Sequence, residues 1–246
     1  MILIIRHKSS DIEFQKELDK NNLNYLYQPV LKFNHIKKKI INSDDKIFII
    51  ASIQAVRSIK LQNKKYLKQI KDSQLFVIGK KVKEALVKLD INNIIKTFDS
   101  TTSLLKFIHK KKFYKKIKFE YLCGSVVNDE FVHRMRDQKY LLKKRIVYQI
   151  TPTNQLLQKT QVAIKNKRIE VIVFYSVYSA KVFLRLLRKY DLLSLINKDV
   201  KFLCFSERIS SHIYSKRVLP NQNIISIRNP NSKLLLRSLE KILNNK

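Results

Sequence analysis

Five apolar runs in this sequence end on a small residue and are followed at once by apolar residues at helical spacing. An apolar run of this length is typical of a strand in a parallel sheet, because crossover helices bury both faces of such a sheet. The small residues that end the runs are Ser52, Gly79, Gly124, Ser176 and Ser206. Alternation of such strands with helices predicts an α/β fold with parallel, doubly wound sheets.

The order of these strand and helix patterns occurs twice along the chain. In this order Ser52 corresponds to Ser176, and Gly79 corresponds to Ser206. The second series has one strand–helix unit fewer than the first, and the unit at residues 2–22 can supply it. We therefore expect two similar flavodoxin-like domains, one of which is discontinuous and contains both ends of the chain.

The expected discontinuous domain comprises residues 1–24 and 154–246, and the expected inserted domain comprises residues 41–140. The segments that join them, 25–40 and 141–153, are rich in β-forming residues, and each contains Tyr-Gln followed by a proline. Proline holds the preceding residue in an extended conformation. The two crossings could therefore pair as a β ribbon and act as a hinge beside an interdomain cleft.

The chain combines a globular composition with an extreme positive charge. Its 246 residues are 45% hydrophobic and carry a formal net charge of +32. Three explanations remain open, namely a solvated lysine-rich surface, an anionic small ligand and nucleic acid. The lysines are dispersed, and glycine falls to two residues and tryptophan to none, so general drift in composition is the favoured explanation. Two glycines cannot build a glycine-rich phosphate loop.

The sequence has few of the residues that commonly bind cofactors, and it has no evident membrane span or secretory signal. Cys123 and Cys204 lie inside apolar runs and are predicted to be buried thiols. The five histidines lack the short spacings of a metal site, so no metal or other cofactor is expected. No apolar run approaches the roughly 18 residues of a membrane span. The amino terminus, MILIIRHK, lacks the charge order of a secretory signal, which predicts a cytoplasmic protein.

The small residues at the strand ends have two possible roles. Ligands of open α/β sheets bind outside the carboxyl ends of the strands, where the next helix offers unpaired N–H groups and a positive dipole end. Alternatively, Ser52, Ser176 and Ser206 are simple helix caps. Both roles stay open for each serine, but placement of all three around one cleft favours anion binding.

The order of the elements and several short strings resemble the uroporphyrinogen-III synthase family. The strings are IIRHK at 4–8, IIAS and QAV within 49–56, VIG at 77–79, YLCG at 121–124, VYQ at 147–149 and FYSVYSA at 174–180. The resemblance implies a monomeric, cofactor-free enzyme of haem and tetrapyrrole biosynthesis. Such an enzyme closes the linear polycarboxylate hydroxymethylbilane to uroporphyrinogen III, with inversion of ring D.

The resemblance also places the family's candidate catalytic tyrosine at Tyr148, in the VYQ string. A phenol can donate a proton to a departing hydroxyl group, although a packed aromatic residue is the alternative. Residues predicted to bind substrate carboxylates are Arg6, Ser52, Gly79, Lys80, Gly124, Ser125, Ser176, Ser206 and Arg208. The family commonly has threonines after the strand in each half. Here Lys80 and Arg208 lie in those segments instead, so the hydroxyl contacts cannot be transferred. These two side chains could hold substrate carboxylates, but a solvated surface charge is the favoured alternative for both.

An alternative function is a basic two-domain α/β module that binds a polyanion such as nucleic acid without catalysis. The charge suits this function, but the sequence has no helix-turn-helix spacing, zinc motif or RNA-binding string. A periplasmic-type binding protein has a similar architecture but would need an export signal. Enzymatic ring closure is therefore the favoured prediction.

Overall fold

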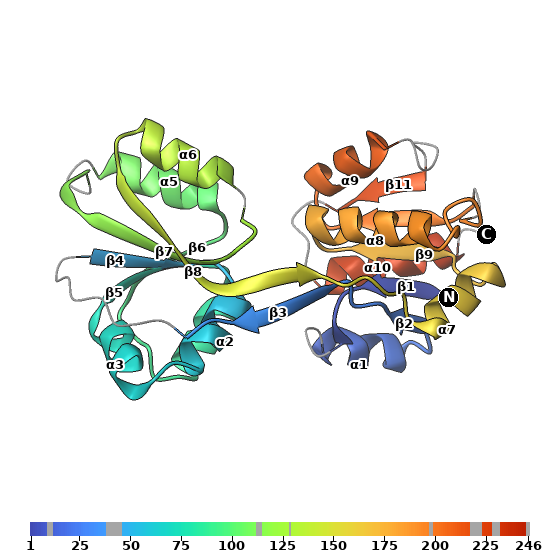
Figure 1. Cartoon of the computed structure of the whole chain (residues 1–246), viewed down its shortest axis with the longest axis horizontal. Helices are drawn as coiled ribbons and strands as arrows, with labels where there is room; N and C mark the ends of the chain where they lie inside the picture. Colours follow the sequence, from blue (N-terminus) through green and yellow to red (C-terminus); the bar gives the residue numbers. More distant parts are fainter. Residues whose placement is uncertain are drawn as a thin grey trace. The chain divides into compact units, whose positions relative to one another are not determined.

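A computed structural model describes residues 1–8, 12–37, 46–111, 115–127, 129–196, 199–216, 223–227 and 232–244. The chain divides into two compact units, Met1–Lys32 with Pro152–Lys246 and Phe33–Thr151. Each unit is a sheet covered by helices (Figure 1).

The first unit contains a parallel sheet in the order β11-β10-β9-β1-β2. Its strands are β1 (Ile2–Ile5), β2 (Tyr25–Tyr27), β9 (Val171–Phe174), β10 (Lys201–Cys204) and β11 (Ile224–Ser226). In β1, Ile4 pairs with Tyr27 on one side and with Val173 on the other. The strand at the start of the chain therefore lies inside the sheet, and the order is the 2-1-3-4-5 order of flavodoxin.

Helices cover both faces of this first sheet. On one face, α7 (Gln158–Lys165), α8 (Val177–Lys189) and α9 (Glu207–Tyr214) pack against apolar side chains such as Leu3 and Phe202. On the other, α1 (Ile12–Lys20) and α10 (Ser232–Asn244) pack against Ile4 and its neighbours. Every residue of β1 and β9 is buried, as expected for strands covered on two faces.

The second unit contains a sheet in the order β3-β8-β7-β4-β5-β6. Its strands are β3 (Leu31–His35), β4 (Lys46–Ile50), β5 (Gln74–Ile78), β6 (Ile94–Phe98), β7 (Lys118–Gly124) and β8 (Leu141–Pro152). The strands from β4 to β8 pair in parallel. Counted from β4, their order is 3-2-1-4-5, which is a circular permutation of the order in the first unit.

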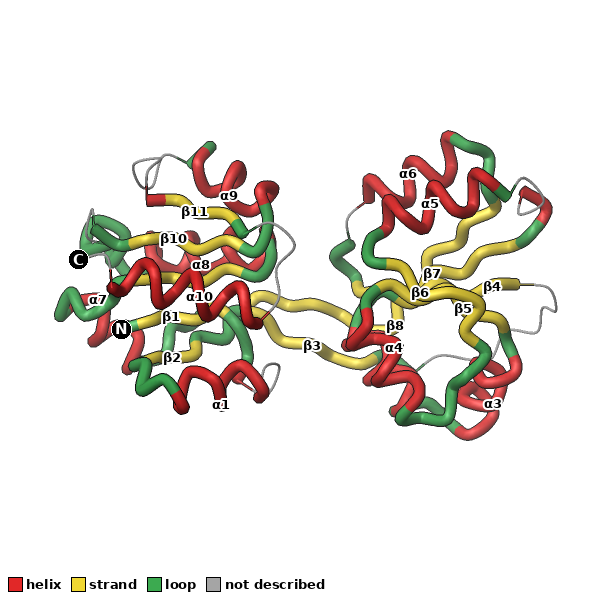
Figure 2. Tube along the Cα trace, turned by 180° about the vertical axis from the view of Figure 1, so that it is seen from behind, coloured by secondary structure: helices red, strands yellow, loops and turns green. Residues whose placement is uncertain are grey.

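The helices of the second unit also lie on both faces of its sheet (Figure 2). One face is covered by α2 (Ile53–Lys60), α3 (Lys64–Asp72) and α4 (Lys80–Val87), and the other by α5 (Thr101–Lys110) and α6 (Asp129–Asp137). The predicted fold class, two similar doubly wound α/β units of which one is discontinuous, is thus confirmed.

The two chain crossings pair with each other through β3 and β8. The Ile36 N–H donates to the Val147 carbonyl oxygen at 2.9 Å, and the Thr153 N–H donates to the Val30 carbonyl oxygen at 2.9 Å. Residue numbers increase along one strand as those of its partner decrease, so the pairing is antiparallel. The predicted ribbon is therefore present.

Parts of the segments that sequence patterning assigns to the crossings belong to the sheets. Residues 25–27 form β2, and residues 141–146 pair with β7. Neither stretch has a continuous apolar run, since the first has three residues and the second is rich in lysine. Residues 38–40 of the expected crossing lie outside the described residues.

Within the described ranges, five turns after helices use residues other than glycine in the left-handed conformation. The residues are Asn22, Asp90, Lys139, Lys167 and Asp191, with φ between 51° and 61°. After each, the next N–H bonds to the carbonyl five positions back, as in the 3.1 Å bond from Ile91 to Leu86. This is the Schellman pattern, which usually contains glycine. At the lysine positions the conformation costs about 1 kcal/mol or more.

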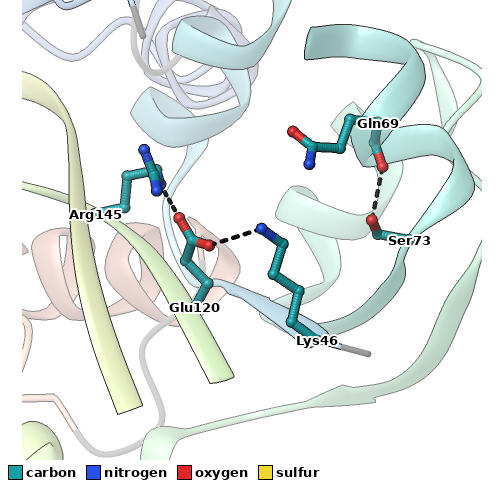
Figure 3. A network of polar contacts seen from close by, with 5 residues as sticks. All are labelled: Lys46, Gln69, Ser73, Glu120 and Arg145. Carbon is teal, nitrogen blue, oxygen red and sulfur yellow. Dashed lines mark hydrogen bonds and ion pairs between the residues drawn. The ribbon is translucent and has the colours of Figure 1, made fainter. Parts of the chain in front are cut away.

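A buried ion network joins three strands of the second sheet. One carboxylate oxygen of Glu120 on β7 lies 3.2 Å from Lys46 Nζ, and the other contacts the Arg145 guanidinium (Figure 3). The side chains of Lys46, Glu120 and Arg145 are 4%, 5% and 13% exposed. Figure 3 also shows Ser73 Oγ donating to the Gln69 carbonyl oxygen, at 2.7 Å, where α3 ends. In the ion network, the Glu120 carboxylate thus compensates the charges of Lys46 and Arg145, which are both largely removed from water.

Removal of this carboxylate should destabilise the protein strongly. Glu120→Ala leaves two buried cations without their shared anion, and we expect a loss of about 3–5 kcal/mol in the free energy of unfolding. The control is Glu130→Ala, because Glu130 pairs with Arg134 on α6 and both side chains are more than half exposed. That change should cost under about 1 kcal/mol. Urea unfolding of the full chain by circular dichroism tests this, and equally small effects would contradict it.

Candidate functional site

Neighbouring strands bring six of the predicted site residues to one edge of the second sheet. Ser52 follows β4, Gly79 follows β5, and Gly124 ends β7 opposite Tyr148 in β8. Ser125 and Lys80 come directly after the two glycines. Because β5, β4, β7 and β8 are adjacent and parallel, their carboxyl ends lie at the same edge.

The hydroxyl groups of Tyr148 and Ser52 lie 3.0 Å apart. Ser52 is also the N-cap of α2, where its Oγ accepts a hydrogen bond from the Gln54 N–H at 3.1 Å. The Tyr148 side chain belongs to the buried core of the unit and contacts Phe33, with ring centroids 6.1 Å apart. Tyr148 is therefore a packed aromatic residue with an ordered hydroxyl group, and its catalytic role stays a prediction.

Burial raises the pKa of the Tyr148 phenol, while the hydrogen bond with Ser52 acts in the opposite direction. A raised pKa keeps the proton on the phenol at neutral pH. The Tyr148 phenol is therefore neutral and carries the proton that a proton donor needs.

Gly124 lies against the Tyr148 ring. A Cβ at this position would be 2.5 Å from Cε2, 2.7 Å from Cζ and 3.0 Å from the hydroxyl oxygen of Tyr148. The Ser125 N–H donates to the Tyr148 carbonyl at 3.0 Å, and Ser125 Oγ accepts from the Ile150 N–H at 2.9 Å. Gly124 and Ser125, both predicted to bind substrate, are thus engaged with β8.

Gly79 and Lys80 begin α4 without a capping side chain. Gly79 is the N-cap and has φ 95° and ψ 132°, a conformation that favours glycine. No side chain bonds to the first-turn N–H groups from this position, and the Lys80 side chain is exposed. The first-turn N–H groups of α4 thus have no side-chain cap, and anion binding at this strand end stays a prediction.

In the first unit, Arg6, Ser176 and Ser206 follow the adjacent strands β1, β9 and β10. Ser176 Oγ caps α8 by accepting from the Ser179 N–H at 3.1 Å. Ser206 is the N-cap of α9 but makes no side-chain cap bond, and Arg208 is exposed in the first turn. The cap interpretation therefore describes the side chains of Ser52 and Ser176 but not that of Ser206.

Two aromatic residues that sequence patterning did not assign to the site also lie at the carboxyl ends of the strands of the first sheet. The Arg6 guanidinium carbon is 4.4 Å from the centroid of the Tyr175 ring, and the Tyr175 and Phe205 ring centroids are 4.2 Å apart. Tyr175 directly precedes Ser176, and Phe205 directly precedes Ser206. This repeated aromatic–serine step is the sequence signal that could have identified them.

In both units a side-chain contact crosses the point where the strand order reverses. This point lies between β1 and β9 in the first unit and between β4 and β7 in the second. Arg6 and Tyr175 join the first pair of strands, while Tyr148 reaches from β8 over β7 to Ser52. Such reversal points are where open α/β sheets bind ligands.

The two cysteines are buried, as predicted. Burial raises the pKa of Cys123 to about 11 and that of Cys204 to about 12. Among the described residues, no group of three or more histidine, cysteine or acidic side chains is placed to hold a metal ion. No helix within the described ranges combines the length and apolarity that crossing a membrane requires.

The fold and its strand-end residues define a class, that of α/β proteins built from two doubly wound units related by circular permutation. A family model described as uroporphyrinogen-III synthase HemD matches residues 12–219. The chain belongs to the uroporphyrinogen-III synthase family. It is accordingly an enzyme of tetrapyrrole biosynthesis that closes hydroxymethylbilane to uroporphyrinogen III. A non-catalytic polyanion-binding module is not favoured.

Solved structures with the same fold include two from bacteria. Uroporphyrinogen-III synthetase from Helicobacter pylori has 13% identity and a TM-score of 0.70, with 98% of each chain covered. A mutant uroporphyrinogen III synthase from the extremely thermophilic bacterium Thermus thermophilus has 12% identity and a TM-score of 0.61, with 100% of each chain covered. Comparison with curated protein sequences gives no match.

Proposed function

We propose that this enzyme binds hydroxymethylbilane at the carboxyl ends of its strands and uses Tyr148 to protonate the departing hydroxyl group. The observation that carries the proposal is the 3.0 Å contact between Tyr148 and Ser52, at the reversal point of the second sheet. It gives a neutral phenol a defined orientation at the place where such a fold binds ligands.

The reaction requires two things from the protein, namely a proton donor and a site that holds the substrate in a folded conformation. The terminal hydroxyl group takes the phenol proton and leaves as water, while the pyrrole nitrogen supplies electrons and keeps its hydrogen, so that a protonated azafulvene forms. This carbon bonds to the substituted position of ring D, giving a spiro intermediate. Fragmentation and reclosure then invert ring D. Holding the chain in the folded geometry supplies the entropic part of the catalysis.

The substrate carboxylates have several potential partners at the strand ends. Arg6 can pair bidentately with a carboxylate, and its contact with Tyr175 limits the orientations of the guanidinium. Gly79 and Ser206 begin helices whose first-turn N–H groups have no side-chain cap. Ser176 caps its helix and offers a hydroxyl group, and the exposed Lys80 and Arg208 add positive charge near these ends.

We further propose that the enzyme acts as a cytoplasmic monomer without a cofactor and without obligate nucleic acid. The chemistry supports the absence of a cofactor, since the pyrrole nitrogen itself expels the leaving group. The family resemblance supports the rest.

A coupled isomer assay tests the ring closure directly. Hydroxymethylbilane is generated enzymatically, this protein is added, and the oxidised products are separated by chromatography. Uncatalysed closure gives the type I isomer, so we expect type III product in proportion to the protein added. Type I product alone, at the rate of the uncatalysed control, would refute the activity.

Tyr148→Phe removes the hydroxyl group and keeps the ring in the core. We expect a folded enzyme whose kcat falls, by up to about a hundredfold, because general-acid assistance is lost. The pyrrole nitrogen still drives the departure, so the loss can be smaller. Type III selectivity should remain, as it depends on how ring D is held. Wild-type kcat would exclude Tyr148 from the chemistry, and loss of folding would support a packing role.

Arg6→Lys keeps the charge but loses the planar fork. We expect the KM for hydroxymethylbilane to rise about tenfold with little change in kcat, because an ammonium group cannot pair bidentately with a carboxylate. The control is Arg188→Lys in the last turn of α8, where the side chain is exposed. If both variants have the wild-type KM, Arg6 does not bind substrate.

A further inference from the structure

We infer that Gly124 and Ser52 are positioning residues for Tyr148, in place of the substrate-binding role that sequence patterning gives them. Gly124 leaves the space in which the phenol ring lies, and Ser52 directs the phenol hydrogen toward the leaving group. The inference rests on the proposed role of Tyr148 for its kinetic consequences, while the fit of the ring against Gly124 can be tested without catalysis.

The strand order explains why a glycine is needed. Tyr148 is on β8 and Ser52 follows β4, and β7 lies between these two strands. The phenol ring must therefore pass over the end of β7, where Gly124 is paired with Tyr148. Carbon atoms in contact lie about 3.5–4.0 Å apart. A Cβ at 2.5 Å from Cε2 would displace the ring.

The backbone of β8 is fixed at the same place. The register of β7 and β8 shifts between Cys123 and Gly124, which brings Gly124 opposite Tyr148. Ser125 then bonds to β8 twice, by its N–H to the Tyr148 carbonyl and by its Oγ to the Ile150 N–H. The ring is thus held at its backbone end by Ser125 and at its hydroxyl end by Ser52.

The cap bond of Ser52 uses one acceptor position of its hydroxyl group, and in the contact with Tyr148 either hydroxyl group can be the donor. Ser52 Oγ already accepts the Gln54 N–H, and a hydroxyl group has one hydrogen to donate. We assign that hydrogen to the Tyr148 oxygen, which leaves the phenol hydrogen for the substrate. When Tyr148 gives up this proton, the Ser52 hydrogen bond stabilises the phenolate. The phenolate recovers a proton from the ring carbon of the product that regains aromaticity.

The chain contains a matched control for the cap itself. Ser100 is the N-cap of α5 in the same unit, and its Oγ accepts from the Ser103 N–H at 3.1 Å. Ser100 is exposed and is not among the residues assigned to the site. Ser100→Ala therefore measures the loss of a helix cap alone.

The kinetic experiment compares the full-length wild type with Ser52→Ala, Ser52→Thr, Ser100→Ala, Tyr148→Phe and the Ser52→Ala/Tyr148→Phe double variant. We expect Ser52→Ala to lower kcat about tenfold with KM unchanged and to move the basic limb of the pH–rate profile to higher pH. Ser52→Thr should restore both, and Ser100→Ala should change neither. In the Tyr148→Phe background, Ser52→Ala should cause no further loss. If Ser52→Ala does not fold, Ser52→Gly replaces it, because glycine is tolerated at an N-cap.

The fit of the ring against Gly124 is measured through folding. Gly124→Ala should lower the thermal midpoint by several degrees in the wild type and by much less in Tyr148→Ala, where the ring is absent. Equal losses in the two backgrounds would overturn the role of Gly124.

The kinetic outcomes separate this inference from the proposed function. A raised KM with unchanged kcat in Ser52→Ala would make Ser52 a substrate ligand and overturn its positioning role. Wild-type kinetics in Ser52→Ala beside a slow Tyr148→Phe would overturn the same role and leave the proposed function standing. Wild-type turnover in Tyr148→Phe would refute the catalytic role of Tyr148 and with it the kinetic part of the inference.

Discussion

Pairing of β1 with both β2 and β9 is the constraint on which the organisation of the chain depends. Ile5 pairs with Phe174, and the amino-terminal ammonium group contacts the Glu170 carboxylate. All four residues of β1 are buried, so this strand forms the inside of the first sheet and not its edge. Because β2 and β9 come from distant parts of the chain, the residues between them must leave the first unit and return. They do so as a separately packed second unit, through the paired strands β3 and β8.

The two units have the same spatial arrangement of strands, related by circular permutation. They carry different side chains at the point where the strand order reverses. In the first unit the reversal point carries a cation against an aromatic pair, Arg6 with Tyr175 and Phe205. In the second it carries a phenol that reaches Ser52. A cation suits a polycarboxylate ligand, and a neutral phenol suits proton donation. The two halves of the repeat are therefore alike in fold and complementary in the groups that they offer.

Individual residues show where prediction from the sequence stopped. Cys123 and Cys204 are buried because they lie in apolar runs, and that inference needed no structure. Gly124 is predicted from the sequence to bind substrate, but its close contact with the ring of Tyr148 on the next strand is known only from the structure. Sequence patterning does not single out Tyr175 and Phe205, because each has the position of the last apolar residue of a strand. The sequence shows that glycine is scarce. It does not show that Lys139 and Lys167 adopt the left-handed conformation where helices end.

The sequence by itself determined the alternation of strands and helices, the repeat and the small residues at the strand ends. These features are local, since a strand buried on two faces must be apolar along its length and a helix must begin just beyond it. Only the tertiary structure decided which side chains meet. The contact of Lys46, Glu120 and Arg145 and that of Ser52, Gly124 and Tyr148 each join three strand segments distant in sequence. Such contacts depend on strand order and register. In strands that are apolar along their whole length no alternation in the sequence fixes the register, so packing of the whole sheet decides it.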